Sequence, residues 1–288
     1  MLSHNLLENI LQIILLPFIL LVSIGRMISG PLIYFGTKRE SIIKKYKGVM
    51  ITGAGSGIGM ELAIKYSKDN DVQKIVLVGR NRAVLEKLQE KINRNGLDVI
   101  IEQQSVVDKV AMEELAKKYN KIIDLVIASA GVSEDTCGDR TFNGRLQKIY
   151  DTNLFGVVNT IQPFIDQWNQ NQINGNGVII SSLTAFSKNL SSAIYSSSKN
   201  AVMVYGNELE KELRKNNTTA SCTVVCPGFV RTNMIRTYKP TIMEGYQAAN
   251  VIYDEIQKGN KMITFPYSLT QVTKFLDLLP DSIRGMLV

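Results

Sequence analysis

The chain has 288 residues, with 33 basic and 26 acidic side chains and a single histidine, His4. Hydrophobic residues at 45% and charged residues at 20% are typical of a folded globular protein with ample chain to bury a core. Zinc sites with several histidine ligands, Ser-His-Asp triads and Cys-His dyads all require an imidazole beside the reacting atoms. Because His4 precedes an apolar run at the N-terminus, we expect any catalysis to use other groups.

The N-terminal segment is apolar. The 17 residues from 9 to 25 are all uncharged, although Pro17 interrupts them, and this length is the low end for a spanning helix. We expect residues 1–37 to form a hydrophobic membrane-anchor helix, followed by a basic collar over 38–47. Positive charge on this flank places the main domain on the cytosolic side, with the endoplasmic reticulum as the expected membrane. Alternatively, the segment is a kinked hairpin that dips into one leaflet, packs on the domain or a partner, or mediates oligomerisation of a soluble protein.

The formal net charge of +7 is concentrated in the collar, which holds five basic residues and one acid. Because the rest of the chain carries only about +3 and no nucleic-acid-binding motif accompanies it, we expect no nucleic-acid partner. The cysteines are Cys137, Cys222 and Cys226. They form neither a disulfide framework nor a C-x-x-C motif, which indicates a reducing compartment.

Apolar runs rich in valine and isoleucine alternate with helical stretches from residue 48 onward. The expected strands are 48–52, 74–79, 98–103, 122–129, 177–182 and 220–226, the last being the final clear strand. The expected helices are one through Lys65, 82–93, 109–119, a long one from about Arg145, and 196–215. This alternation predicts an α/β fold, a Rossmann-type doubly wound parallel sheet, in a single domain over 48–266.

A glycine-rich turn, TGAGSGIG, follows the first expected strand at 52–59. Its spacing is G-x-x-x-G-x-G rather than G-x-G-x-x-G, and its position before a helix predicts a dinucleotide site. An NAD site has an acid about 20 residues further on, and here that place holds Gly79 and Arg80. A guanidinium can bind a 2′-phosphate bidentately, so the sequence favours NADP(H) over NAD.

Tyr195 and Lys199 stand four residues apart at the start of an expected helix, so they share one face. A cationic neighbour stabilises a phenolate, and we therefore expect Lys199 to lower the pKa of Tyr195 from about 10 by roughly 2–3 units. Ser182 ends the preceding strand, where its hydroxyl can hydrogen-bond a substrate carbonyl oxygen. The three side chains together predict proton transfer to or from a carbonyl or alcohol.

Several motifs occur in one order: TGAGSGIG, ASAG (128–131), Asn153 in DTNLFG, Ser182, YSSSK (195–199) and PGFVRT (227–232). In order and spacing they resemble the short-chain dehydrogenase/reductase family over residues 48 to about 266. The resemblance implies a nicotinamide cofactor and oxidoreduction of alcohol and carbonyl groups.

The resemblance also implies roles for individual residues. Tyr195 would be the general acid/base, Lys199 would bind the nicotinamide ribose, Ser182 would orient the substrate, and Asn153 would hold a relay water. Ser182 and Tyr195 would contact substrate. The implied cofactor site comprises Gly53, Ser56, Gly57, Ile58, Gly59, Arg80, Val106, Ala130, Gly131, Tyr195, Lys199, Pro227, Gly228, Val230 and Thr232, and no metal is expected.

Two positions depart from the family pattern. The usual Asn-Asn-Ala-Gly reads Ala128-Ser129-Ala130-Gly131, so the hydrogen bonds of the asparagine side chains are missing. The usual acid after the third strand is replaced by Ser105. Both changes affect the expected cofactor affinity, but neither removes a proton-transfer group.

Two C-terminal segments bear on the substrate. Residues 233–244 carry several apolar side chains and are either a surface loop or an apolar mouth. Residues 267–288 predict an amphipathic tail that caps the core or contacts a membrane. With the anchor, these features favour a small lipophilic carbonyl or alcohol substrate of the sterol, retinoid, fatty acyl or sphingoid type, reduced with NADPH. A homodimer stays open, and the alternative function is a catalytically weak NADP-binding scaffold or regulator at a membrane.

Overall fold

The computed structural model describes residues 44–186, 193–232, 234, 242–266, 270, 271 and 273. The expected anchor over 1–37 and most of the collar lie outside these residues, as do most of 233–244 and 267–288. No helix in the described part of the chain is long and apolar enough to cross a membrane.

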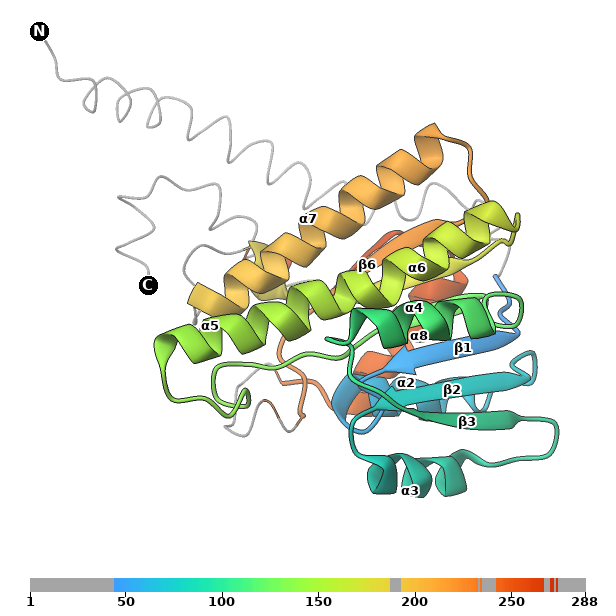
Figure 1. The fold of residues 1–288 in the computed structure, drawn as a ribbon, viewed down its shortest axis with the longest axis horizontal. Helices are drawn as coiled ribbons and strands as arrows, with labels where there is room; N and C mark the ends of the chain where they lie inside the picture. The colour runs from blue at the N-terminus through green and yellow to red at the C-terminus, as the bar shows by residue number, and fades with distance from the viewer. Residues whose placement is uncertain are drawn as a thin grey trace, which may run out of the picture.

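Seven parallel strands form one sheet in the order β3-β2-β1-β4-β5-β6-β7. Figure 1 shows β1, β2 and β3 side by side at one end of the sheet. The strands are β1 (Gly48–Thr52), β2 (Lys74–Gly79), β3 (Asp98–Gln103), β4 (Leu125–Ala128), β5 (Asn176–Ile180), β6 (Ser221–Pro227) and β7 (Met262–Phe265). The strand order reverses between β1 and β4, and ligands of doubly wound sheets bind at this switch point, beyond the carboxyl ends of the strands.

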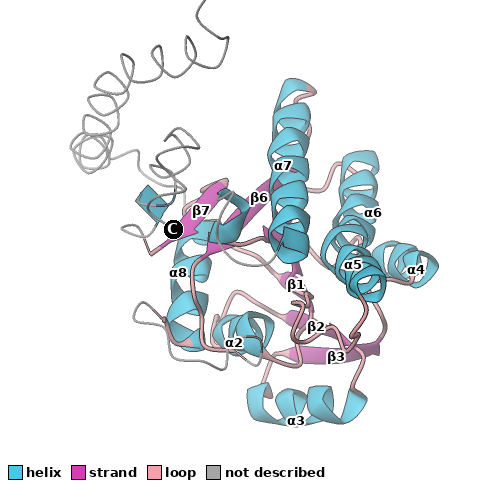
Figure 2. Ribbon diagram, turned by 90° about the vertical axis from the view of Figure 1, so that its left-hand side faces the viewer, coloured by secondary structure: helices cyan, strands magenta, loops and turns pink. Residues whose placement is uncertain are grey.

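Helices cover both faces of the sheet (Figure 2). One face carries α2 (Gly57–Tyr66), α3 (Arg82–Ile92) and α8 (Gly245–Gln257), and the other carries α4 (Lys109–Tyr119), α6 (Gly156–Gln170) and α7 (Ala193–Lys215). A short helix, α5 (Phe142–Tyr150), joins α6 through the π-helical turn η1 (Asp151–Phe155), and the 3-10 turn η2 (Leu183–Phe186) precedes α7. The expected doubly wound sheet in a single α/β domain is therefore confirmed.

The continuous apolar character of the strands follows from burial on both faces. Successive strand residues point to opposite faces, so Val49 and Ile51 pack in the core beneath α2 and α8, whereas Met50 packs in the core beneath α4 and α6. All five residues of β1 are buried. This two-sided burial explains why the strands show no polar alternation.

The structure differs from the expectation in two places. The strand β7 and the helix α8 were not predicted, and β7 extends the sheet beyond β6. The long helix expected from about Arg145 begins instead at Phe142 and is divided by η1.

Candidate active site

The glycine-rich turn between β1 and α2 lies directly against β4. Gly53 has φ +68°, and a Cβ there would stand 2.7 Å from the Ala130 Cα. Gly59 is equally constrained, since its Cβ would stand 2.6 Å from the Gly53 carbonyl oxygen. Gly57 has φ +55° and faces Thr232. Gly53, Gly57 and Gly59 are thus required by backbone conformation or close packing.

The start of α2 presents its amide groups at this turn. Ser56 is the N-cap residue, and its side chain makes no capping hydrogen bond in the described structure. The first N–H groups of a helix lack intrahelical partners and, with the helix dipole, favour an anion. The turn therefore fits the pyrophosphate of a dinucleotide.

A cavity of about 690 Å³ lies beyond the carboxyl ends of the central strands. It brings together nearly all the site residues predicted from the sequence. Its lining includes Gly53, Ser56, Gly57, Ile58, Arg80, Val106, Ala130, Gly131, Ser182, Tyr195, Lys199, Pro227, Gly228, Val230 and Thr232. Gly59 and Asn153 are not on its wall.

Arg80 lies at one end of this cavity, directly after β2, and its side chain is exposed. The guanidinium forms no ion pair with any described residue. The acids among the described lining residues are Glu134 and Asp135, both in the loop after β4, whereas the loops after β2 and β3 contribute none. The position beside β2 is therefore basic, as the sequence predicted.

Tyr195 and Lys199 enter the cavity from the first turns of α7. The Lys199 Nζ lies 5.7 Å from the centre of the Tyr195 ring and donates a hydrogen bond of 3.0 Å to the Ile180 carbonyl. The Ser181 hydroxyl donates to the Lys199 carbonyl at 2.7 Å. These bonds fix the start of α7 against the end of β5. The strand ends at Ile180, so Ser182 follows it by two residues and does not end the strand as expected.

The expected lowering of the Tyr195 pKa is wrong. Burial raises the pKa of Tyr195 to about 12, although a hydrogen bond with Ser182 acts in the opposite direction. Burial also lowers the pKa of Lys199 to about 8. Desolvation disfavours the charged form of both groups, and the stabilisation expected of the Lys199 charge does not overcome it. Tyr195 is therefore protonated at neutral pH.

Asn153 lies in the π-helical turn η1 and is fully buried. Its Oδ1 accepts from the Val132 backbone N–H at 2.8 Å, and its Nδ2 donates to the Val132 carbonyl at 2.9 Å and to the Ser198 hydroxyl at 3.1 Å. The side chain thus joins the loop after β4 to α7. The expected role in holding a water stays a prediction, since the side-chain contacts seen are with protein groups.

Thr52 contacts the backbone of the segment that lacks the family's asparagines, residues 128–131, and of the residue before it. Its hydroxyl lies 3.5 Å from both the Ile127 carbonyl, to which it donates, and the Ala130 backbone N–H, from which it accepts. These long contacts connect the end of β1 with the loop after β4. No functional or structural role of Thr52 was expected from the sequence.

Other lining residues were also missed. The loop after β4 contributes Ser133, Glu134, Asp135 and Thr136, and Thr152, Thr184 and Thr273 add hydroxyl groups. Their place after strand ends was the available signal. Met234, from the expected apolar mouth, lines the cavity, and the buried Thr270 and Thr273 show that the start of the C-terminal segment packs on the domain. No cluster of metal-ligating side chains occurs among the residues that the structure describes.

A glycine-rich first turn, a parallel sheet and a tyrosine–lysine pair in one cavity define a nucleotide-dependent α/β oxidoreductase. The family model for short chain dehydrogenases matches residues 47–242, and the chain belongs to this family of enzymes acting on alcohol and carbonyl groups. It is 28% identical to an uncharacterized oxidoreductase of Myxococcus xanthus (strain DK1622), over 82% of this chain and 94% of the relative. It is 31% identical to an uncharacterized oxidoreductase of Staphylococcus aureus (strain USA300), over 68% of this chain and 83% of the relative.

Solved structures share the fold. A short-chain dehydrogenase from Sphingobium yanoikuyae in complex with NADPH has a TM-score of 0.70 and 21% identity, covering 84% of this chain and 95% of that chain. A short chain dehydrogenase/reductase from Burkholderia phymatum in complex with NAD has a TM-score of 0.68 and 19% identity, covering 80% and 92%. Because these neighbours hold different coenzymes, the coenzyme of this chain has to be argued from its own residues.

Proposed function

We propose that this chain is an NADP(H)-dependent oxidoreductase that reduces a lipophilic carbonyl compound. The observation that carries the proposal is a single cavity with Arg80 on its wall after β2, and Ser182, Tyr195 and Lys199 on its wall at β5 and α7. The first end suits a phosphorylated ribose, and the second suits a reacting carbonyl group.

The residues present fit a dinucleotide. The constrained glycines leave the backbone open where a pyrophosphate would bind, and Gly131 keeps space beside Lys199, since a Cβ there would stand 3.4 Å from the Lys199 Nζ. When bound, the nicotinamide supplies or accepts the hydride. Pro227, Gly228, Val230 and Thr232 would hold that end of the coenzyme.

The chain's own residues then manage the proton and the carbonyl group. Tyr195 is protonated at neutral pH, since its pKa is about 12, and it donates a proton to the developing alkoxide. The Ser182 hydroxyl donates a hydrogen bond to the carbonyl oxygen. Lys199 holds the ribose and stabilises the phenolate as it forms. Reduction is the proposed physiological direction because NADPH is the abundant form of the coenzyme in a reducing compartment, which the cysteine content indicates.

NADP(H) is preferred over NAD(H) because of charge. Arg80 offers a guanidinium to a 2′-phosphate, and Ser105 leaves no carboxylate beside the adenine end. The exposed Arg80 has no competing ion pair among the described residues.

The lipophilic substrate is supported by the apolar part of the lining, which includes Val132, Leu183, Phe229 and Met234. We also propose that residues 1–37 anchor the protein in a membrane, with the endoplasmic reticulum as the expected one and the domain in the cytosol. The support is the uncharged run over 9–25 followed by basic residues. Carbonate-resistant association of the full chain with membranes tests this; release by carbonate would favour the soluble alternative.

The reductase proposal is tested by NADPH oxidation against a panel of lipophilic ketones and aldehydes. We expect turnover with at least one class, and we expect Tyr195→Phe to reduce kcat by about 10²–10⁴-fold, because a general acid contributes roughly that much. A circular dichroism spectrum and NADPH binding that match the wild type establish that the variant is folded. NADPH binding without turnover on any substrate would overturn the proposal in favour of the scaffold alternative.

A further inference from the structure

The described residues at the two edges of the sheet differ in charge. Because all strands are parallel, every loop that leads into a strand lies on one edge, here called the amino edge, and every loop that leaves a strand lies on the other, the carboxyl edge. The described loops of the amino edge hold eight basic and three acidic side chains: Lys44, Lys45, Lys47, Lys68, Arg94, Lys121, Lys258 and Lys261 against Asp69, Asp71 and Asp124. The last turn of α7 adds Arg214 and Lys215 to this edge.

The carboxyl edge, where the cavity opens, holds no such positive excess among the described residues, although its loops also contain Lys188, Arg236 and Lys239 outside them. Its described loops hold three basic and five acidic side chains: Arg80, Arg140 and Arg231 against Asp108, Glu134, Asp135, Asp139 and Glu244. The positive excess of the described domain is therefore concentrated on the edge opposite the active site.

Much of this charge is exposed and not neutralised within the domain. Lys47, Lys68, Lys121 and Lys215 are exposed and make no ion pair with a described residue. They precede β1, β2, β4 and β6, so they are distributed across most of the sheet.

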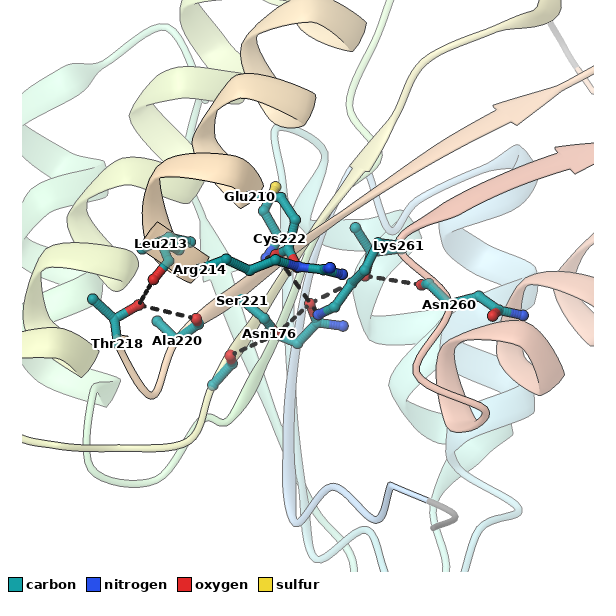
Figure 3. Close-up of polar contacts among 12 residues, drawn as sticks. Asn176, Glu210, Leu213, Arg214, Thr218, Ala220, Ser221, Cys222, Asn260 and Lys261 are labelled. Atoms are coloured by element: carbon teal, nitrogen blue, oxygen red, sulfur yellow. Dashed lines mark hydrogen bonds and ion pairs between the residues drawn. The ribbon is translucent and has the colours of Figure 1, made fainter. Parts of the chain in front are cut away.

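Near the start of β6 and β7, two cations share a single carboxylate (Figure 3). Glu210 is shared by Arg214 at 2.8 Å and Lys261 at 3.7 Å, and it also accepts the Cys222 backbone N–H at 2.7 Å. The Lys261 Nζ is buried without a hydrogen-bond partner among the described residues. Burial, and then the nearby charge of Lys44, lowers the pKa of Lys261 to about 8. An external anion would relieve this excess of cations.

We infer that the amino edge is a docking surface for a membrane rich in anionic lipid headgroups. The chain enters the domain at this same edge, because residues 44–47 lead into β1 and the 43 residues before them include the proposed anchor. A flat set of basic side chains next to a membrane anchor attracts acidic lipid through the surface potential. The inference rests on the membrane association proposed above and adds the face of the domain that contacts the bilayer.

Lysine footprinting of the full chain tests the orientation. The protein is mixed with vesicles of phosphatidylcholine alone or with phosphatidylserine, treated with an amine-reactive reagent and mapped by mass spectrometry. We expect Lys47, Lys121 and Lys215 to be protected only by the anionic vesicles, while Lys87 and Lys109 stay reactive. If anionic vesicles changed the labelling of the two sets of lysines equally, or protected Lys87 and Lys109, the inference would be overturned.

A charge variant gives a second measurement. Replacing Lys47, Lys68, Lys121 and Lys215 by glutamine should reduce partitioning into anionic vesicles at low salt by at least about tenfold, since each cation near the surface contributes about a fivefold factor. If insertion of residues 1–37 keeps the variant bound, the anionic vesicles should no longer protect the lysines that remain on the amino edge, Lys45 and Lys258. A control with the same charge change, Lys87, Lys109, Arg140 and Lys148 to glutamine, should behave like the wild type.

Two further measurements distinguish membrane docking from nucleic-acid binding and from a failure of the reductase proposal. If duplex DNA produced the same footprint at lower concentration than the anionic vesicles, the surface would serve nucleic acid and the inference would fail. NADPH oxidation by the first variant without vesicles should equal that of the wild type, so a failed footprint is distinguishable from a failed reductase proposal.

Discussion

Lys199 is a cation held almost out of contact with solvent, since it is 4% exposed. Its one described hydrogen bond goes to the Ile180 carbonyl rather than to a carboxylate. The fold therefore destabilises the charged form, and this is the physical origin of its lowered pKa of about 8. The residue keeps its charge at neutral pH but loses it in mildly alkaline solution.

This gives a pH dependence of stability. Folded Lys199 releases its proton near pH 8 and unfolded Lys199 near 10.5, so between these values the unfolded chain binds more protons and stability rises with pH. We expect the Lys199 contribution to the free energy of unfolding to increase by about 2 kcal/mol from pH 8 to pH 10. Urea unfolding of the wild type and Lys199→Met measures it, since only the wild type should show this increase. Lys261→Met is the control, and its free energy of unfolding should still rise between pH 8 and pH 10 by the contribution of Lys199. Equal pH slopes for the wild type and Lys199→Met would contradict the prediction.

Arg80 should determine the choice of coenzyme. In Arg80→Asp the guanidinium is replaced by a carboxylate that repels a 2′-phosphate, so we expect the ratio of kcat/KM for NADPH to that for NADH to fall by about 10–100-fold. Arg82→Asp is the matched control, because Arg82 pairs with Glu86 at 2.9 Å and does not line the cavity. An unchanged preference in Arg80→Asp would exclude Arg80 from phosphate recognition.

At the scale of elements, the turn between β1 and α2 depends on glycine at some positions and not at others. Gly59→Ala places a Cβ 2.6 Å from the Gly53 carbonyl oxygen, and we expect it to lower the free energy of unfolding by about 1–3 kcal/mol. In Gly55→Ala the nearest atom is the Val84 Cγ1 at 3.4 Å, so a much smaller change is expected. Urea unfolding of both variants decides this, and equal losses would show that the close approach is not the cause.

The elements differ in how far the sequence predicts them. Six strands were found because two-sided burial makes them nearly continuous apolar runs bounded by polar turns. The strand β7 has only four residues, MITF, and lies against β6 alone, so its local pattern is too short to identify. The division of the long helix at η1 depends on packing around Asn153, which no local periodicity records.

In the candidate site, too, local motifs could be predicted from the sequence, whereas features that depend on the fold could not. Residues in short motifs, such as Tyr195 and Lys199, could be placed from spacing alone. The direction of the Tyr195 pKa shift could not, because it depends on how much solvent the fold removes. The contribution of Thr52 also depends on β1 and β4 being neighbours, although Thr52 and Ile127 are 75 residues apart in the chain.

At the scale of the whole molecule, Trp168 is the only tryptophan of the chain and is fully buried. Its Nε1 donates to the Ile123 carbonyl at 2.9 Å, and its ring lies 5.4 Å from that of Phe164. It therefore reports packing of α6 against the loop that leads into β4.

Because one sheet joins both halves of the domain, we expect its unfolding to be cooperative. The midpoint of the Trp168 fluorescence transition in urea should equal that of the far-ultraviolet circular dichroism transition. Trp168→Phe serves as the control, since its fluorescence change should disappear while a single dichroism transition remains. A fluorescence midpoint at clearly lower urea would show that the α6 region unfolds before the rest.

The cavity and the basic amino edge lie at opposite ends of the strands, and this has a consequence for substrate delivery. With the amino edge on a bilayer, the cavity opens at the far end of the strands, one domain thickness out in the aqueous phase. A carbonyl compound dissolved in the lipid would then have to leave the bilayer before it reached Tyr195. Turnover should accordingly follow the concentration of substrate free in water rather than its mole fraction in the membrane, and compounds of moderate chain length should outperform those that never leave the lipid.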